Sequence, residues 1–298
     1  RQSISGFMAI TVFFLLPIAL LGVPGEVVAV VAPLHLFAQY WYHTRLIGRM
    51  GVLEHIIVTP SHHRVHHAIN KEYLDKNLSQ IFIIWDKLFG TFQEELDEVP
   101  PVYGVTRPVR TWNPILINFM HLWQLIRDAW RTKDWKAKFL IWFKPTGWRP
   151  ADVKAQYPLE GIKDPYAYEK YDPKLSASLR CWSWVQFTAV FLLMMYLFNN
   201  LADIGAQGAL VYGAFLVFCI FSFTMLMDKS RYAWGVELAK SLIGLGILWI
   251  QGNWFGMSHL FALAPYLLAA YFLISIGVVY YFSAAEVSPK RENLEVAN

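Results

Sequence analysis

Four histidines crowd into one hexapeptide of the sequence, at positions 62, 63, 66 and 67. On a helix, His62/His66 and His63/His67 are pairs four residues apart, and all four side chains fall within an arc of about 140°. Neutral imidazole is the commonest protein ligand for first-row metals. The cluster therefore indicates a metal site on one helix face, and the alternatives are a surface histidine patch or a pH sensor.

A further ligand is predicted at His43, the first polar residue after an apolar run that ends at Tyr42. This position is expected to emerge on the same membrane face as the cluster. The four remaining histidines are isolated, and each is more typical of a structural residue than of a ligand. The predicted metal ligands are His43, His62, His63, His66 and His67.

The surroundings of these histidines suggest supporting residues but do not identify the metal. A ligating histidine usually donates its free N–H to a carboxylate or carbonyl. Asp75 and Asp86 are the predicted partners, and the alternative role for both is a helix cap or turn residue. Neither Cys181 nor Cys219 belongs to a CxxC pair, which argues against a thiolate site. An all-nitrogen ligand set is compatible with iron, copper or zinc.

The composition indicates that a lipid bilayer positions these residues. Of 298 residues, 56% are apolar and only 16% are charged, whereas a soluble domain is nearer a quarter charged. Uncharged runs at 7–23 and 27–42, separated by Pro24 and Gly25, predict a helical hairpin in the membrane whose ends return to one side; a hairpin in a soluble core is the alternative. We expect an all-α, polytopic membrane protein with a cytoplasmic-face histidine cluster, whose later apolar runs are Trp182–Asn199, Ala209–Met227, Val236–Ile250 and Leu260–Phe282.

These patterns divide the chain into four predicted parts. Residues 1–95 hold the hairpin and the histidines, 96–180 form a basic, Trp-rich interfacial or cytoplasmic segment, 181–284 hold four spans, and 285–298 form a polar tail. Basic segments alternate with neutral loops, so the positive-inside rule places the histidine cluster and the tail in the cytoplasm. The modest net charge of +4 and the lack of a basic arm argue against nucleic-acid binding.

Two features of the later segments each have two interpretations. Between Trp112 and Trp148, six tryptophans alternate with basic residues, which suits a helix in the headgroup layer or an ordinary amphipathic helix packed on a soluble domain. Glu237 and Lys240 stand one turn apart within an apolar run. Such a pair can satisfy itself or reach the interface, and it can also mark a functional site.

The order of motifs around the histidines resembles the end of the fatty acid hydroxylase and sterol desaturase superfamily domain, and most closely its alkylglycerol monooxygenase branch. The resemblance is carried by Thr59–His67, Tyr73, Asp75–Asn77 and Trp85–Phe92. It implies an integral membrane enzyme of lipid metabolism that binds two irons, activates O2, and hydroxylates or desaturates a lipid C–H position. The ether-lipid branch hydroxylates the carbon next to the ether oxygen with a reduced pterin, which makes tetrahydrobiopterin a candidate cofactor; the electron donor is unassigned.

The resemblance also assigns roles to individual histidines. The last HxxHH element of the family falls on His63, His66 and His67, and the single histidine before it falls on His43. His62 completes a double-HH pattern and is either a ligand or a supporting residue. The earlier HxxxH and HxxHH elements are absent, and Arg1–Ser3 resembles the residues that follow the second of them. We therefore expect the two-iron activity to belong to a full-length parent protein.

Two other functions fit parts of the pattern. A membrane zinc hydrolase would use a glutamate as general base, but the HExxH arrangement that supports one is missing. A membrane metal-binding or anchoring module without enzymatic activity is favoured by the missing ligand elements.

Overall fold

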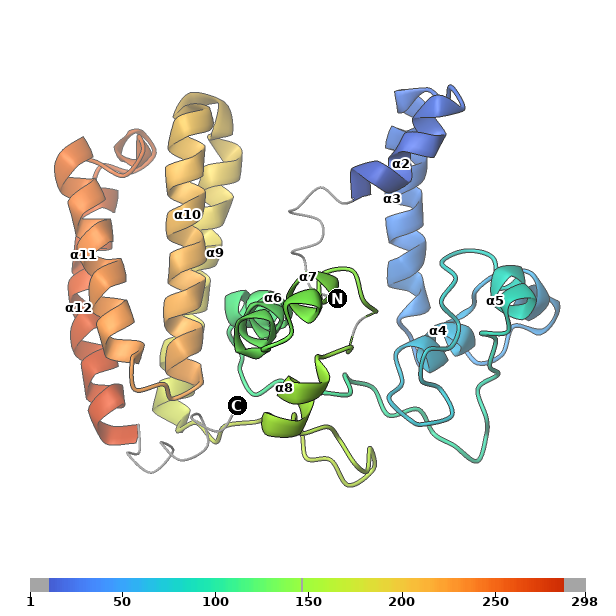
Figure 1. The fold of residues 1–298 in the computed structure, drawn as a ribbon. Coiled ribbons are helices and arrows are strands. Elements are labelled where there is room, and N and C mark those ends of the chain that lie inside the picture. The colour runs from blue at the N-terminus through green and yellow to red at the C-terminus, as the bar shows by residue number, and fades with distance from the viewer. Residues whose placement is uncertain (1–10, 146, 287–298) are drawn as a thin grey trace. The chain divides into compact units, whose positions relative to one another are not determined.

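The computed structural model describes residues 11–145 and 147–286, and within these ranges the chain is helical and contains no β-strand. The chain divides into two compact units (Figure 1). Unit 1 comprises residues 11–109 together with Glu160–Lys170, and unit 2 comprises Arg110–Leu159 together with residues 171–286. The predicted polar tail lies almost entirely outside the described residues.

Unit 1 opens with the predicted hairpin, formed by α2 (Thr11–Leu20) and α3 (Gly25–Tyr42). Gly22 adopts a φ of 74°, which lets the chain reverse before Pro24 caps α3. Most of the side chains of α3 are exposed apolar groups. The short helices η1 (Gly51–His55), α4 (Pro60–His66) and α5 (Ile84–Phe89) follow.

Side chains bonded to backbone groups stabilise the loops of unit 1. The Tyr73 hydroxyl donates to the carbonyl of Val99 at 2.6 Å. The Asn77 amide donates to the carbonyl of Gln93 at 2.8 Å and accepts from the Gln93 N–H at 2.9 Å. Because such bonds hold irregular backbone without a large apolar core, unit 1 depends on a few buried polar residues.

Unit 2 contains four long apolar helices, each long and apolar enough to cross a membrane. They confirm the four predicted runs and make the chain an integral membrane protein. These candidate spans are α9 (Ala177–Asn199), α10 (Leu201–Met227), α11 (Ala233–Gln251) and α12 (Ala264–Glu286). The other helices of unit 2 are α6 (Pro114–Arg131), α7 (Trp135–Leu140), α8 (Ala151–Gln156) and η2 (Met257–His259). Helix α10 begins eight residues before the predicted run, and Gly205, at a non-helical φ of 71° and ψ of 167°, kinks it near its start.

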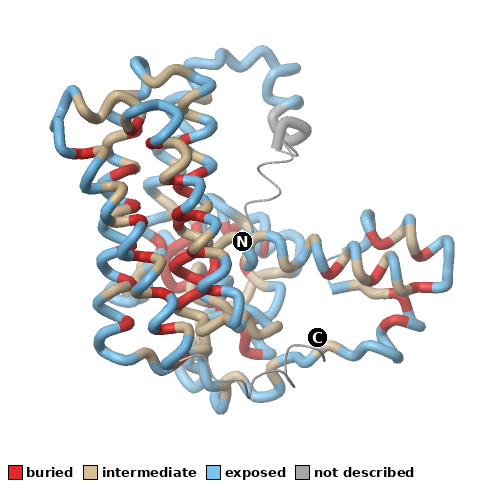
Figure 2. The backbone as a smooth tube through the Cα atoms, turned by 90° about the vertical axis from the view of Figure 1, so that its left-hand side faces the viewer, coloured by how far each residue is buried: buried red, intermediate tan, exposed pale blue. Residues whose placement is uncertain are grey.

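The interior of the four-helix region combines apolar packing with one ion pair. Buried residues follow the helices where they face one another, and the outer faces are exposed (Figure 2). Lys240 Nζ lies 2.5 Å from Glu237 Oε1, and both side chains are almost completely buried. Glu237 also accepts bonds from Ser222 on α10 at 2.7 Å and from Ser275 on α12. The pair therefore satisfies itself with neighbouring helices instead of reaching the interface.

Candidate metal centre

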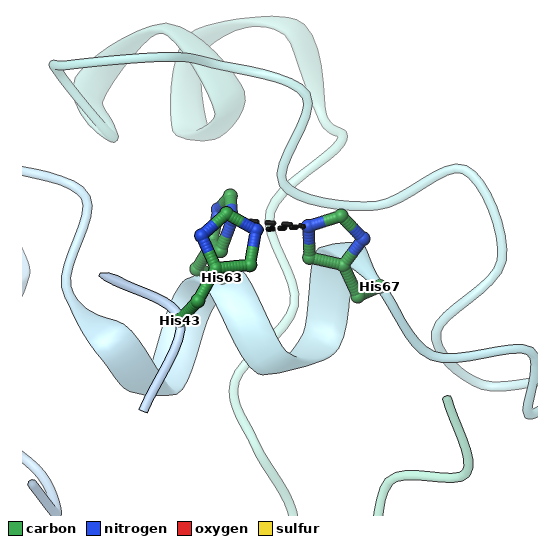
Figure 3. A group of neighbouring side chains, drawn as sticks. All are labelled: His43, His63 and His67. Carbon is green, nitrogen blue, oxygen red and sulfur yellow. Dashed lines mark hydrogen bonds between the residues drawn. The ribbon is translucent and has the colours of Figure 1, made fainter. Parts of the chain in front are cut away.

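Three histidine side chains of unit 1 point toward one another (Figure 3). The Nε2 atoms of His43, His63 and His67 are separated by 3.0 Å in each of the three pairs. His63 is half-buried, whereas His43 and His67 are exposed. The structure therefore gathers three of the five predicted ligands at one point and leaves that point open on one side.

The local sequence explains why two of these rings come from adjacent turns. Pro60 occupies the first turn of α4, where its fixed φ and missing N–H fit a helix start. His63 lies within α4, and His67 is the residue that ends it. Side chains four residues apart lie on one face of a helix, so the two rings share a side. Their centroids are 4.5 Å apart.

The third ring reaches this point from the end of α3. The Nδ1 of His43 donates to the carbonyl of Gln39 at 2.6 Å, one turn back along that helix. With its proton on Nδ1, the neutral imidazole of His43 directs the lone pair of Nε2 at His63 and His67. A backbone carbonyl that fixes the tautomer in this way is a common support for a metal-ligating histidine.

The three contacts cannot all be hydrogen bonds. Each nitrogen of a neutral imidazole is either a donor or an acceptor, so in a triangle of three nitrogens at least one pair is of the same kind. A cation among three lone pairs removes this conflict. Three nitrogens about 2.1 Å from one ion and at right angles would lie about 3.0 Å apart. The observed spacing fits a metal ion that also keeps open coordination positions.

The electrostatics of the site favour the ligand form of the rings. Burial and the neighbouring His67 and His43 rings lower the pKa of His63 to about 3. Burial, with the His66 ring next, lowers the pKa of His67 to about 4. Both rings are consequently neutral at pH 7 and can bind a metal without first releasing a proton.

Arg64 joins the two segments that carry the trio. Its guanidinium donates to the carbonyls of Thr44 at 3.0 Å and Ile47 at 2.8 Å, directly after His43. The same group makes an ion pair with Glu95 at 2.6 Å, and both side chains are largely buried. Since Arg64 follows His63 on α4, these bonds hold the His43 segment against α4.

The histidine site lies within a region shared with known proteins. The family model described as Fatty acid hydroxylase matches residues 1–91, which contain all three converging histidines. Residues 1–91 are thus similar to the fatty acid hydroxylase family. No solved structure matches the chain.

Similarity to curated relatives extends beyond the fatty acid hydroxylase region. The chain is 33% identical over 279 residues to alkylglycerol monooxygenase from Homo sapiens, which covers 92% of this chain and 59% of that protein. It is 32% identical over 223 residues to the protein of the same name from Xenopus tropicalis, covering 75% and 50%. It is 32% identical over 254 residues to alkylglycerol monooxygenase from Danio rerio, which covers 82% of this chain and 54% of that protein. The chain thus spans between half and three fifths of the length of these relatives.

The other two predicted ligands, His66 and His62, occupy different positions relative to the three converging histidines. The exposed His66 ring lies next to the trio, with its centroid 5.7 Å from that of His63 and 5.1 Å from that of His67. The buried His62 ring instead completes the capping box of α4, where its Nδ1 faces the N–H of Thr59 at 3.4 Å. Its Nε2 is buried without a hydrogen-bond partner.

Of the two predicted supporting carboxylates, Asp75 lies in a turn and Asp86 lies in α5. Asp75 is exposed and adopts a φ of 57°, the left-handed conformation of a tight turn. Asp86 is buried and accepts bonds from the N–H groups of Leu78 at 2.7 Å and Ser79 at 3.0 Å, and from the hydroxyl of Thr91 at 2.6 Å. Asp86 thus holds the loop that precedes α5 by accepting hydrogen bonds from its backbone.

Three supporting groups have little or no signal in the sequence. The carbonyl of Gln39 is a backbone group, which residue type does not reveal. Arg64 uses backbone carbonyls as acceptors, so its role appears only once the chain is folded. Glu54 is buried and accepts from Ser61 at 2.7 Å and from the N–H of Met50 at 2.9 Å. Burial raises the pKa of Glu54, but these bonds outweigh it and lower the pKa overall.

Proposed function

We propose that this chain forms part of a membrane-bound, O2-dependent lipid monooxygenase in which His43, His63 and His67 hold iron. The observation that carries the proposal is the convergence of three imidazole nitrogens, 3.0 Å apart, within a fatty acid hydroxylase region. The nitrogen set alone also accepts copper or zinc. The family and the monooxygenase names of the relatives favour iron.

The complete centre proposed for the full-length protein contains two irons. His62 and His66 are further candidate ligands, since both belong to the histidine cluster of α4 and its end. Tetrahydrobiopterin is the proposed reducing cofactor and O2 the co-substrate, while the electron donor is left unassigned. An alkyl ether lipid is the first substrate to test, because the similar proteins are named alkylglycerol monooxygenases; fatty acid or sterol hydroxylation and desaturation are the alternatives.

Bound iron in such a centre would supply the oxidising chemistry that inserts oxygen into a lipid C–H bond. The residues of this chain position that chemistry. The carbonyl of Gln39 keeps the Nε2 lone pair of His43 directed at the centre, and Arg64 fixes the segment after it. Helix α3 exposes Val30 and Phe37 before it ends beside His43, so an acyl chain lying along α3 leads to the site.

The proposed topology places the site in the cytoplasm, following the basic segments of the sequence. The loop Asp228–Arg231 between α10 and α11 is on the same side in this proposal. Labelling of Ser230→Cys by a membrane-impermeant maleimide tests it. Protection in intact cells and labelling after lysis support the topology, and labelling in intact cells contradicts it.

The decisive test of the function uses the purified full-length protein. Two irons, with O2 consumption that depends on an alkylglycerol and a reduced pterin, would support the proposal. A single zinc would favour a hydrolase, and no metal would favour an anchoring module; either result contradicts it. His67→Ala is expected to lose iron and activity, whereas His121→Ala, which alters an exposed residue of α6 in unit 2, is expected to keep both.

A further inference from the structure

Helix α6 of unit 2 exposes its apolar face. Five large apolar side chains repeat at intervals of three and four residues, and at 100° per residue they fall within an arc of about 80°. All are exposed, and Trp130 is 86% exposed. We call this row the α6 stripe; it consists of Leu116, Phe119, Trp123, Ile126 and Trp130.

The polar face of the same helix is buried instead. Asp128 is 1% exposed and receives two bonds from Arg149, at 2.6 and 3.0 Å. Gln124 is also buried and donates to Asp128 at 2.6 Å. Arg149 continues to the carbonyl of Tyr157 at 2.8 Å. Protein therefore covers Gln124 and Asp128 on the polar face of α6, while the large apolar side chains of the opposite face stay exposed.

Helix α7 extends this apolar surface and adds positive charge. Four aromatic side chains of α7 and the residues directly after it are exposed: Trp135, Phe139, Trp142 and Phe143. The Lys138 ammonium donates to the carbonyls of Ala129 at 2.9 Å and Trp130 at 3.3 Å, which ties α7 to the end of α6. Exposed lysines flank the rings, at positions 133, 136 and 144. Aromatic rings beside basic side chains are typical of the membrane–water boundary.

Helix α6 is anchored at one end of a candidate membrane span. Asp228, which ends α10, accepts from the N–H of Trp112 at 2.7 Å and from the hydroxyl of Thr111, just before α6 begins. The Asn113 amide donates to the carbonyl of Phe221 on α10 at 3.2 Å. In Figure 1, α6 is viewed nearly along its axis while α10 runs up the page, so α6 runs across the direction of the span.

We propose that α6 and α7 lie in the plane of the membrane interface, with the α6 stripe among acyl chains and the flanking lysines on anionic lipid headgroups. The occupant is a bilayer for two reasons. The start of α6 is hydrogen-bonded to α10 near the end of that candidate span. The exposed rings and lysines also match the acyl-chain layer and the headgroup layer of a membrane interface. A second protein chain would bury the stripe equally well but would not require the lysines. This inference does not depend on the metal centre.

Site-directed spin labelling of the full-length protein in lipid nanodiscs tests the proposal. The native cysteines are first removed, and spin labels are then placed at Trp123→Cys and Ile126→Cys in the α6 stripe and at Lys136→Cys as the control. Ile126→Cys is included because it is a smaller change of side chain than Trp123→Cys. Labels at 123 and 126 should be relaxed severalfold more by O2 than by a water-soluble nickel chelate, and the order should reverse at 136. Stronger relaxation by nickel at 123 and 126, or weak relaxation by both reagents, would overturn the proposal.

The headgroup part of the proposal has its own test. The depth of a label at Trp130→Cys is compared in phosphatidylcholine nanodiscs with and without phosphatidylglycerol. Anionic lipid should draw the label deeper, and the combined changes Lys133→Gln, Lys136→Gln and Lys144→Gln should abolish that shift. A depth that does not respond to anionic lipid, or that responds equally without the lysines, contradicts the role of the lysines.

Discussion

The two units of this apolar chain arrange their polar groups in opposite ways. In unit 2, Glu237 and Lys240 neutralise each other, and serines from neighbouring helices complete their bonds. In unit 1, the imidazoles of His43, His63 and His67 converge at 3.0 Å without a hydrogen-bond pattern that satisfies all three. Satisfied polar groups stabilise a fold, whereas convergent lone pairs require a ligand.

The two kinds of similarity to known proteins also differ between unit 1 and unit 2. The fatty acid hydroxylase model ends at residue 91, inside unit 1, but the match to human alkylglycerol monooxygenase covers 92% of the chain. The four-helix unit is therefore shared with those relatives beyond the family region. Its buried ion pair belongs to the architecture of unit 2, and the convergent histidines belong to the family region.

The largest expected effect is on the ion pair of unit 2. Lys240→Met leaves the Glu237 carboxylate buried without its partner and should lower the free energy of unfolding by about 3–5 kcal/mol. The double variant Glu237→Gln, Lys240→Met should recover most of that loss. Unfolding in detergent measures both. Equal losses in the single and double variants would mean that the pair is not coupled.

Arg64 is the matching test in unit 1. Arg64→Ala removes charged hydrogen bonds to Glu95 and to the carbonyls after His43, and should cost about 2–3 kcal/mol of stability. It should also weaken metal binding, because His43 loses its support. Metal titration and hydrogen exchange of the full-length protein measure the two effects. Weakened binding in the Lys240→Met variant to the same extent would erase the distinction between the units.

Packing between α11 and α12 gives a smaller effect. A Cβ at Gly244 would lie 2.6 Å from the buried Phe272 ring, whereas a Cβ at Gly246 meets nothing within 4 Å. Gly244→Ala should therefore destabilise unit 2 by about 1–3 kcal/mol. Gly246→Ala is the matched control, with a neutral or slightly stabilising effect on the helix. Thermal unfolding separates them, and indistinguishable melting temperatures would contradict the packing.

The smallest effect is the pH response of Asp86. Burial raises the pKa of Asp86, but bonds from Ser79 and Thr91 outweigh it and hold the pKa below its ordinary value of about 4. A lowered folded-state pKa adds stability above the ordinary pKa, and that stability is lost as the pH falls through the folded value. Between pH 7 and pH 3, the free energy of unfolding should fall less steeply in Asp86→Asn than in the parent protein. Parallel pH curves would exclude this role.

Sequence patterns predicted the helices better than the site. Long apolar runs gave the four spans because burial in lipid requires uninterrupted apolar composition. The pair His63/His67 followed from helical spacing, but the departure of His62 into a capping box did not, since that position normally carries glutamate or glutamine. The partners of Asp86 and Arg64 are mainly backbone groups, and sequence does not show where those lie. Ligand roles of His62 and His66 stay predictions.

X-ray absorption at the iron edge of the full-length protein tests the central claim most directly, because it counts the imidazoles around each iron. The variant His43→Ala removes the ring at the end of α3, whereas His63 and His67 come from α4 and its end. His35→Ala, which changes a histidine within α3, is the control. The convergence of His43 with His63 and His67 predicts that iron content and imidazole number both fall in His43→Ala and stay unchanged in His35→Ala. Undiminished iron and imidazole number in His43→Ala would contradict it.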